Sequence, residues 1–102
     1  MIEIKNLRQE NIDIECGYLV DRRTVLGNPF TIGKDGDREQ VINKYRNNWD
    51  ELIKLPAART LFDLMVARYR RNGTIKLYCW CAPKPCHADV IKEKILEAVG
   101  EV

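Results

Sequence analysis

Residues 74–99, TIKLYCWCAPKPCHADVIKEKILEAV, encode a strand, a tight turn and a helix in immediate succession. In residues 74–81 one strand face would carry Ile75, Leu77, Cys79 and Cys81, and the other Lys76, Tyr78 and Trp80. This alternation and the many strand-favouring residues predict the central strand of a sheet. A turn over residues 82–85 follows, and residues 87–99 have the three-to-four spacing of a helix that ends at Gly100. A strand leading directly into a helix is typical of α/β folds, whose ligands usually bind at the carboxyl ends of the strands.

The remaining sequence predicts two more strands, two more helices and one long loop. The strands are expected at residues 1–6 and 18–20, and residues 21–37 lack periodicity, which indicates an irregular loop. A helix over residues 38–54 opens with a capping-box pattern, and a second helix runs from Pro56 to Asn72. We therefore expect a small α/β domain: a sheet of about three or more strands with helices packed on it in two or three Rossmann-like layers.

Length and composition fit one globular domain covering residues 1–102, with 45% hydrophobic and 31% charged residues. The net charge of +2 gives little general attraction for nucleic acid, so any anion site must be local. The sequence shows no basic leader and no apolar run long enough for a membrane span, so we expect a cytoplasmic protein. In that compartment its four cysteines are expected as free thiols or metal ligands. The oligomeric state stays open, a homo-oligomer included.

Cys86 and His87 stand at the start of the last predicted helix and are the first candidates for chemistry. Unpaired backbone N–H groups at a helix start favour negative charge, so we expect a lowered pKa for the Cys86 thiol and a neutral His87. Cys86 is then a candidate nucleophile, and His87 and Asp89 are candidate acid/base groups. The plainer alternative is that Cys86 caps the helix and His87 packs against the loop.

Zinc binding is a second hypothesis, since Cys79, Cys81, Cys86 and His87 are four potential ligands. Their spacing is unlike that of structural zinc sites, which usually combine two pairs whose members are separated by two to four residues. Cys79 and Cys81 share a strand face with apolar residues, which favours packing under a helix. Zinc binding through these four residues is therefore the less favoured hypothesis, and it stays open.

Anion binding is a third hypothesis, compatible with either chemistry. Lys84, the N–H groups at the helix start and Arg22 with Arg23 from the long loop would surround a phosphate, although Asp89 would oppose it. In the same loop Gly27 permits close approach of a ligand, Asn28 belongs to a turn, and Phe30 either anchors the loop or stacks on a ring. The alternative is a set of solvated surface charges.

Three motifs, VDRR at residues 20–23, LGNPF at residues 26–30 and CWCAPKPCHADV at residues 79–90, resemble the small bacterial and phage family named domain of unknown function 4326. The resemblance covers nearly the whole chain and implies a small α/β domain without an assigned reaction. It also implies that the LGNPF loop and the Pro-Cys-His turn meet at one pocket. The matching positions are Arg22, Arg23, Gly27, Asn28, Pro29, Phe30, Cys79, Cys81, Pro85, Cys86, His87 and Asp89.

We expect this protein to bind a nucleotide or a related phosphorylated small molecule in a cleft formed by residues 22–30 and 84–89. Whether it also catalyses hydrolysis or group transfer at that ligand stays open at this point. The alternatives are a non-catalytic phage protein that sequesters a nucleotide and a zinc-stabilised interaction module.

Overall fold

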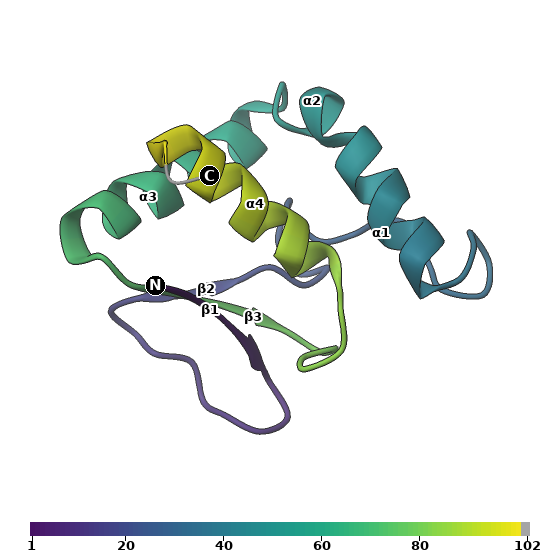
Figure 1. Cartoon of the computed structure of the whole chain (residues 1–102), viewed down its shortest axis with the longest axis horizontal. Coiled ribbons are helices and arrows are strands. Elements are labelled where there is room, and N and C mark those ends of the chain that lie inside the picture. Colours follow the sequence, from purple (N-terminus) through teal and green to yellow (C-terminus); the bar gives the residue numbers. More distant parts are fainter. Residues whose placement is uncertain (101–102) are drawn as a thin grey trace.

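The computed structural model describes residues 1–100 and shows a parallel sheet with helices packed on one side (Figure 1). The strands are β1 (Ile2–Asn6), β2 (Gly17–Leu19) and β3 (Ile75–Cys79). The helices are α1 (Arg38–Asn47), α2 (Trp49–Leu52), α3 (Pro56–Asn72) and α4 (His87–Val99). The order of elements along the chain is the predicted one, and the predicted α/β class is confirmed. None of the helices in residues 1–100 is long and apolar enough to cross a membrane.

The strand β3 lies at the centre of the sheet, as its sequence predicted. The strand order is β1-β3-β2, and both neighbours run parallel to β3. Ile4 of β1 and Tyr18 of β2 both stand opposite Leu77. Because all three strands are parallel, their carboxyl ends meet at one edge of the sheet, where the long loop and the turn before α4 also begin.

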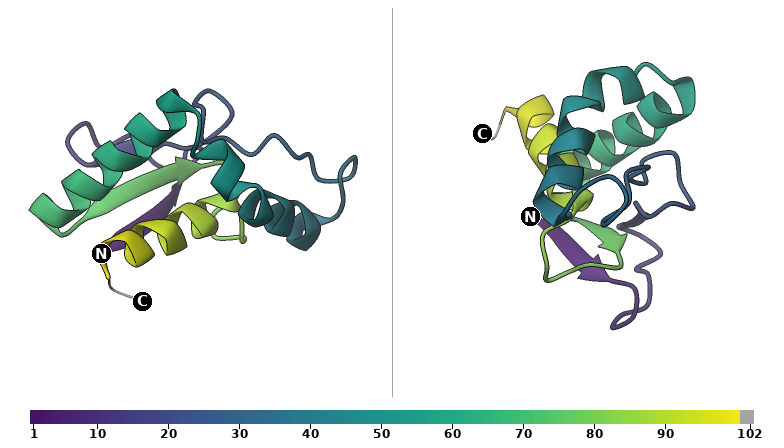
Figure 2. Two further views of the ribbon diagram at one scale, coloured as in Figure 1. Left: turned by 90° about the horizontal axis from the view of Figure 1, so that it is seen from above. Right: turned by 90° about the vertical axis from the view of Figure 1, so that its right-hand side faces the viewer.

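The helices α1, α3 and α4 lie on the same side of the sheet, so the molecule has two layers (Figures 1 and 2). A hydrophobic core lies between the sheet and the helix layer, and both layers contribute fully buried side chains to it: Ile75 and Leu77 from β3, Met65 from α3, and Ile91 and Ile95 from α4. Each such side chain contributes roughly 1.5–3 kcal/mol through burial. Of the two-layer and three-layer arrangements that the sequence left open, the structure has the two-layer one.

The opposite face of the sheet is covered by the connection between β1 and β2. Tyr78 alternates with Leu77 along β3, so its side chain lies on that face, where it is almost completely buried. Its hydroxyl oxygen accepts a hydrogen bond of 3.0 Å from the backbone N–H of Asp13, and the Asp13 carboxylate pairs with Lys76 at 3.1 Å. These contacts join the irregular connection to the central strand.

Two predicted elements are shorter in the structure. The helix expected over residues 38–54 is broken at Asn48 into α1 and α2, and the strand expected to reach Cys81 ends at Cys79. The helix starts and stops follow the predicted chemistry. Asp37 and Gln40 form the capping box of α1, and Gly100 ends α4 with a left-handed φ of 78°.

Gly27 occupies a point in the long loop where a side chain has no room. A Cβ on its backbone would lie 2.5 Å from both the carbonyl oxygen of Asp21 and the Cα of Arg22. We expect Gly27→Ala to lower the free energy of unfolding by about 1–3 kcal/mol, because overpacking forces the backbone to shift. Urea unfolding measures this loss, with Lys34→Ala at an exposed position of the same loop as the control. Equal stability of the two variants would show that the loop accommodates the added atom.

Candidate functional site

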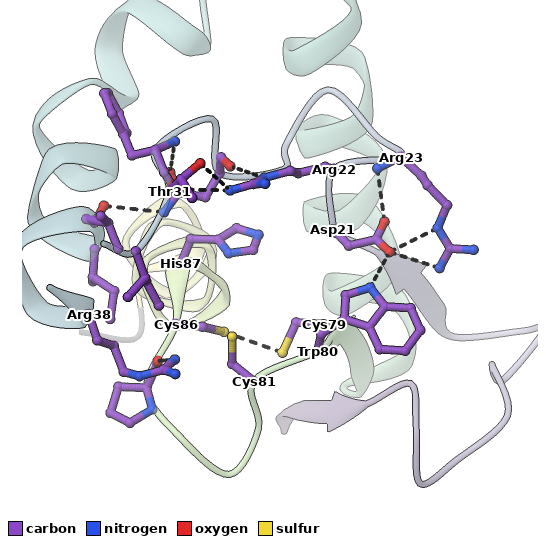
Figure 3. Close-up of a pocket in the computed structure, with 16 residues that line it drawn as sticks. Asp21, Arg22, Arg23, Thr31, Arg38, Cys79, Trp80, Cys81, Cys86 and His87 are labelled. Atoms are coloured by element: carbon purple, nitrogen blue, oxygen red, sulfur yellow. Dashed lines mark hydrogen bonds and ion pairs between the residues drawn. The ribbon is translucent and has the colours of Figure 1, made fainter. Parts of the chain in front are cut away.

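A pocket of about 700 Å³ opens at the carboxyl end of β3 (Figure 3). Its walls come from residues 21–32 of the long loop, the start of α1, the end of β3 and the turn into α4. The chain connects these segments through long crossovers, and the parallel sheet brings them to one edge. Parallel α/β sheets commonly bind their ligands at this edge.

The structure brings together most of the residues singled out from the sequence. Those that line the pocket are Arg22, Arg23, Asn28 and Phe30 from the long loop, with Cys79, Cys81, Pro85, Cys86 and His87 from the end of β3 and the turn. The LGNPF loop and the Pro-Cys-His turn therefore face one cavity, although they lie far apart in the sequence.

Pro29 and three of the candidate site residues do not line the pocket. Lys84 is exposed, and its backbone N–H donates to the carbonyl oxygen of Cys81 at 2.8 Å within the turn. Gly27 is a tight packing point between loop segments. The Asp89 carboxylate accepts a hydrogen bond of 2.9 Å from the backbone N–H of Cys86 and so caps α4. The predicted ligand contacts of Lys84 and Gly27, and an acid/base role for Asp89, have no support in this geometry.

Arg22 organises the long loop from within the pocket wall. Its Nε donates to the carbonyl oxygen of Asn28 at 3.0 Å, and one terminal nitrogen donates to the carbonyl oxygen of Phe30 and to Thr31 Oγ1. The buried Asn28 side chain accepts from the Phe30 N–H at 2.9 Å and donates to the carbonyl oxygen of Val41 on α1. These bonds fasten the loop to α1 and hold its polar groups in place.

A second set of polar contacts, among Asp21, Arg23 and Trp80, joins the long loop to the residue that follows β3. The Asp21 carboxylate accepts from the Trp80 indole N–H at 2.9 Å and pairs with Arg23 at 2.9 Å. Burial disfavours the charged carboxylate, but the hydrogen bonds from Arg23 and Trp80 outweigh it and lower the pKa of Asp21. Because this carboxylate already has its partners, it does not compensate the other arginines of the pocket.

Arg22 and Arg38 have no acidic partner among residues 1–100. The acceptors of Arg22 are backbone carbonyls and a hydroxyl, and Arg38 donates to the carbonyl oxygen of Pro85 at 3.0 Å. Neutral acceptors orient a guanidinium without neutralising it. The pocket wall therefore presents two uncompensated positive charges, which Figure 3 shows on either side of His87.

Sequence reasoning placed Arg38, Val41 and Ile42 on a helix and did not assign them to the site. All three line the pocket, because α1 begins directly after the long loop and its first turns face the loop. The signal was present in the order of the elements: a helix that directly follows a loop lining a pocket begins close to that pocket. Thr31 and Ile32, at the end of the loop, complete this side of the pocket.

His87 is largely buried, with 9% of its surface exposed, yet its ring lines the pocket. Its Nε2 lies against the carbonyl oxygen of Val20, so Nε2 carries the proton, and its ring packs edge-on to Tyr45 with centroids 5.2 Å apart. Burial lowers the pKa of the imidazole. His87 is therefore neutral near pH 7, and its Nδ1 is an unprotonated acceptor without a hydrogen-bond partner among the described residues.

The thiols of Cys79 and Cys86 meet at the pocket floor with their sulfurs 3.4 Å apart. The hydrogen bond from Cys86, assisted by the N–H groups of Cys81 and Ala82, lowers the pKa of Cys79 to about 6. The same hydrogen bond, together with burial, raises the pKa of Cys86. The direction of these two shifts does not support the prediction that Cys86 is the more acidic thiol: the mutual hydrogen bond favours the thiolate at Cys79, which the sequence suggested either packs under a helix or binds zinc.

An ultraviolet titration of thiolate absorbance tests this assignment. We expect one thiol of the folded protein to ionise with a pKa well below the value of about 8.5 for a free cysteine. Cys79→Ser should remove that transition. Cys86→Ala should raise the pKa of the Cys79 thiol, because the S–H group that donates to Cys79 is lost. Cys16→Ser, remote from the pocket beside Asn72, is the control. An unchanged acidic transition in Cys79→Ser would contradict the assignment.

Within residues 1–100 no group of three or more His, Cys, Asp or Glu side chains has an arrangement that would hold a metal ion. His87 Nε2 lies against the backbone carbonyl oxygen of Val20.

A family model described as a domain of unknown function (DUF4326) matches residues 3–97. This interval includes all pocket-lining residues and every motif that carried the resemblance. No curated protein and no solved structure gave a significant match to the chain.

Proposed function

Because the chain belongs to the family named domain of unknown function 4326, whose description assigns no activity, we propose a function from the pocket itself: binding of a nucleotide or a related phosphorylated small molecule. The observation that carries the proposal is the pair Arg22 and Arg38, two guanidinium groups in one pocket wall without acidic partners among the described residues. Guanidinium groups bind phosphate oxygens through strong charge-assisted hydrogen bonds. An anionic ligand would supply the missing negative charge.

The rest of the pocket suits an apolar or aromatic part of the same ligand. Its wall contains Phe30 and Ile32 from the loop and Val41 and Ile42 from α1. The volume of about 700 Å³ falls in the range of about 300–1,000 Å³ that is usual for small-molecule sites. A base or another ring would contact these side chains while the phosphate meets the arginines. We place this binding in the cytoplasm, where the four cysteines, all free in the structure, stay reduced.

Turnover of the ligand is a second candidate function, and one observation favours it. The neutral imidazole of His87 offers an unpartnered Nδ1 in the same pocket, which is what a general base requires. The reaction class would be hydrolysis or group transfer at the bound phosphorylated compound. Incubation of the protein with the ligand, followed by chromatography, distinguishes a converted ligand from one that is bound and intact.

A thermal-shift screen tests the binding proposal. The panel contains nucleoside mono-, di- and triphosphates and sugar phosphates, each beside its unphosphorylated parent compound. We expect at least one phosphorylated compound to raise the melting temperature, because a ligand that binds only the folded state stabilises it by mass action. Its unphosphorylated parent should give a much smaller shift. Shifts from no phosphorylated compound, or equal shifts from parent and phosphorylated forms, would reject the proposal.

A further inference from the structure

The pocket floor contains a pair of thiols that ligand binding does not require. Cys79 ends the central strand and Cys86 precedes α4, so two rigid elements hold their sulfurs 3.4 Å apart. Both side chains line the pocket, and neither is in a disulfide. Figure 3 shows the two sulfurs facing each other, with Cys81 beside them.

We propose that Cys79 and Cys86 form a redox-active dithiol, which a hydroperoxide entering the pocket oxidises to an intramolecular disulfide. This modification site is independent of the proposed ligand. Its oxidant is a small molecule, hydrogen peroxide or an organic hydroperoxide, and the pocket is large enough to admit it.

The two thiols differ in a way that suits them to consecutive steps. Cys79 receives the S–H of Cys86 and the backbone N–H groups of Cys81 and Ala82, all of which stabilise a thiolate at its sulfur. Cys86 keeps its proton, since burial and the neighbouring Cys79 sulfur both disfavour a second thiolate. Thiolates are the nucleophiles in thiol oxidation, so Cys79 is the sulfur that reacts first.

The chemistry balances as a two-electron oxidation of the pair. The Cys79 thiolate attacks one peroxide oxygen, so that an S–O bond forms, the O–O bond breaks, and the departing alkoxide or hydroxide takes up a proton from water. Cys86 then attacks the sulfenic acid sulfur of Cys79, so that the S–S bond forms and the S–O bond breaks. The leaving hydroxide takes the Cys86 proton and departs as water. The two thiols are oxidised and the hydroperoxide is reduced to an alcohol or water.

Cys86 is the resolving thiol that the geometry selects. Its sulfur is already in contact with that of Cys79 and needs to approach only from 3.4 Å to the disulfide bond length of about 2.05 Å. Cys81 lies two residues beyond Cys79 and is partly exposed, which makes it the natural competitor to exclude by experiment. Cys16 lies beside Asn72, away from the pocket, and provides a matched control thiol.

The experiment uses the full chain, reduced and then freed of reductant. After treatment with one equivalent of hydrogen peroxide, remaining thiols are alkylated and counted by mass spectrometry. We expect the wild-type protein to lose two alkylatable thiols, and Cys16→Ser and Cys81→Ser to lose the same two. Glutathione should restore both thiols in each case.

Two further variants assign the steps. Cys79→Ser should lose no thiol under the same treatment, whereas Cys86→Ser should accumulate a sulfenic acid at Cys79 that dimedone traps. The proposal is overturned if the wild-type protein keeps all four thiols, if Cys81→Ser abolishes the disulfide, or if dimedone labels Cys81 in place of Cys79. If one cysteine variant folds poorly, peptide mapping of the oxidised wild-type protein identifies which two cysteines the disulfide joins, and a disulfide that does not join Cys79 to Cys86 overturns the proposal.

Discussion

The double substitution Arg22→Gln/Arg38→Gln is expected to weaken binding of the phosphorylated ligand by about 100-fold, and each single substitution by about tenfold. A hydrogen bond to a charged group contributes roughly 1.5–3 kcal/mol, and a factor of ten in affinity corresponds to about 1.4 kcal/mol. Glutamine retains a polar side chain but removes the charge that no acidic residue among residues 1–100 compensates. Isothermal titration calorimetry with the compound selected by the screen measures the change.

Arg59→Gln is the matched control for this prediction. It makes the same change in net charge as each single substitution but lies on α3 in an exposed pair with Asp63, outside the pocket. The affinity of this variant should stay within about twofold of the wild type, because exposed charges at a distance are largely screened by salt. Equal losses in the control and in the pocket variants would mean that net charge, and not the pocket, governs binding.

A structural effect of Arg22→Gln has to be separated from loss of its charge. Arg22 donates three hydrogen bonds to the loop, whereas Arg38 donates one to Pro85. The single Arg38→Gln variant is therefore the cleaner probe of charge, and Arg22→Lys retains the charge while breaking the fork of hydrogen bonds. If Arg38→Gln binds as tightly as the wild type, Arg38 has no part in the site.

Part of the pocket could be predicted from the sequence, because the fold brings the predicted segments to one edge of the sheet. The alternation in residues 74–81 and the abrupt change to helical spacing after Pro85 were enough to predict β3, α4 and the edge of the sheet at which the pocket opens. The resemblance of motifs implied that the Asn28 loop and the His87 turn share a cavity, and both segments line it.

Other features depend on contacts that a linear pattern does not contain. The pKa order of Cys79 and Cys86 follows from their mutual hydrogen bond and from two backbone N–H groups directed at Cys79, and not from the position of Cys86 at a helix start. Lys84 looked suited to a phosphate because of its charge, but the turn exposes it away from the pocket. The direction of a side chain in a turn depends on tertiary contacts. The sequence pattern therefore predicted that Lys84 lies in the turn, but not where its side chain points.

Leu77→Ala is expected to lower the free energy of unfolding by about 2–5 kcal/mol, the largest loss of stability among our predictions. Leu77 is completely buried at the middle of β3, opposite Ile4 and Tyr18 on its two neighbours. Its removal leaves a cavity where both strands and the helix layer meet, and the surrounding side chains collapse only in part. Urea unfolding followed by circular dichroism measures the loss.

Leu64→Ala gives a control of identical chemistry. Leu64 lies on α3 with 55% of its surface exposed, so its truncation creates no cavity, and alanine is the better helix former. We expect its stability to stay within about 0.5 kcal/mol of the wild type. Because the free energy of unfolding of a native protein is only about 5–15 kcal/mol, the Leu77 variant would lose a large part of its stability. The strand that contains Leu77 also positions Cys79 and Trp80, so the Leu77→Ala substitution should weaken ligand binding as well. A loss of stability in Leu64→Ala as large as that in Leu77→Ala would show that β3 is not the centre of the core.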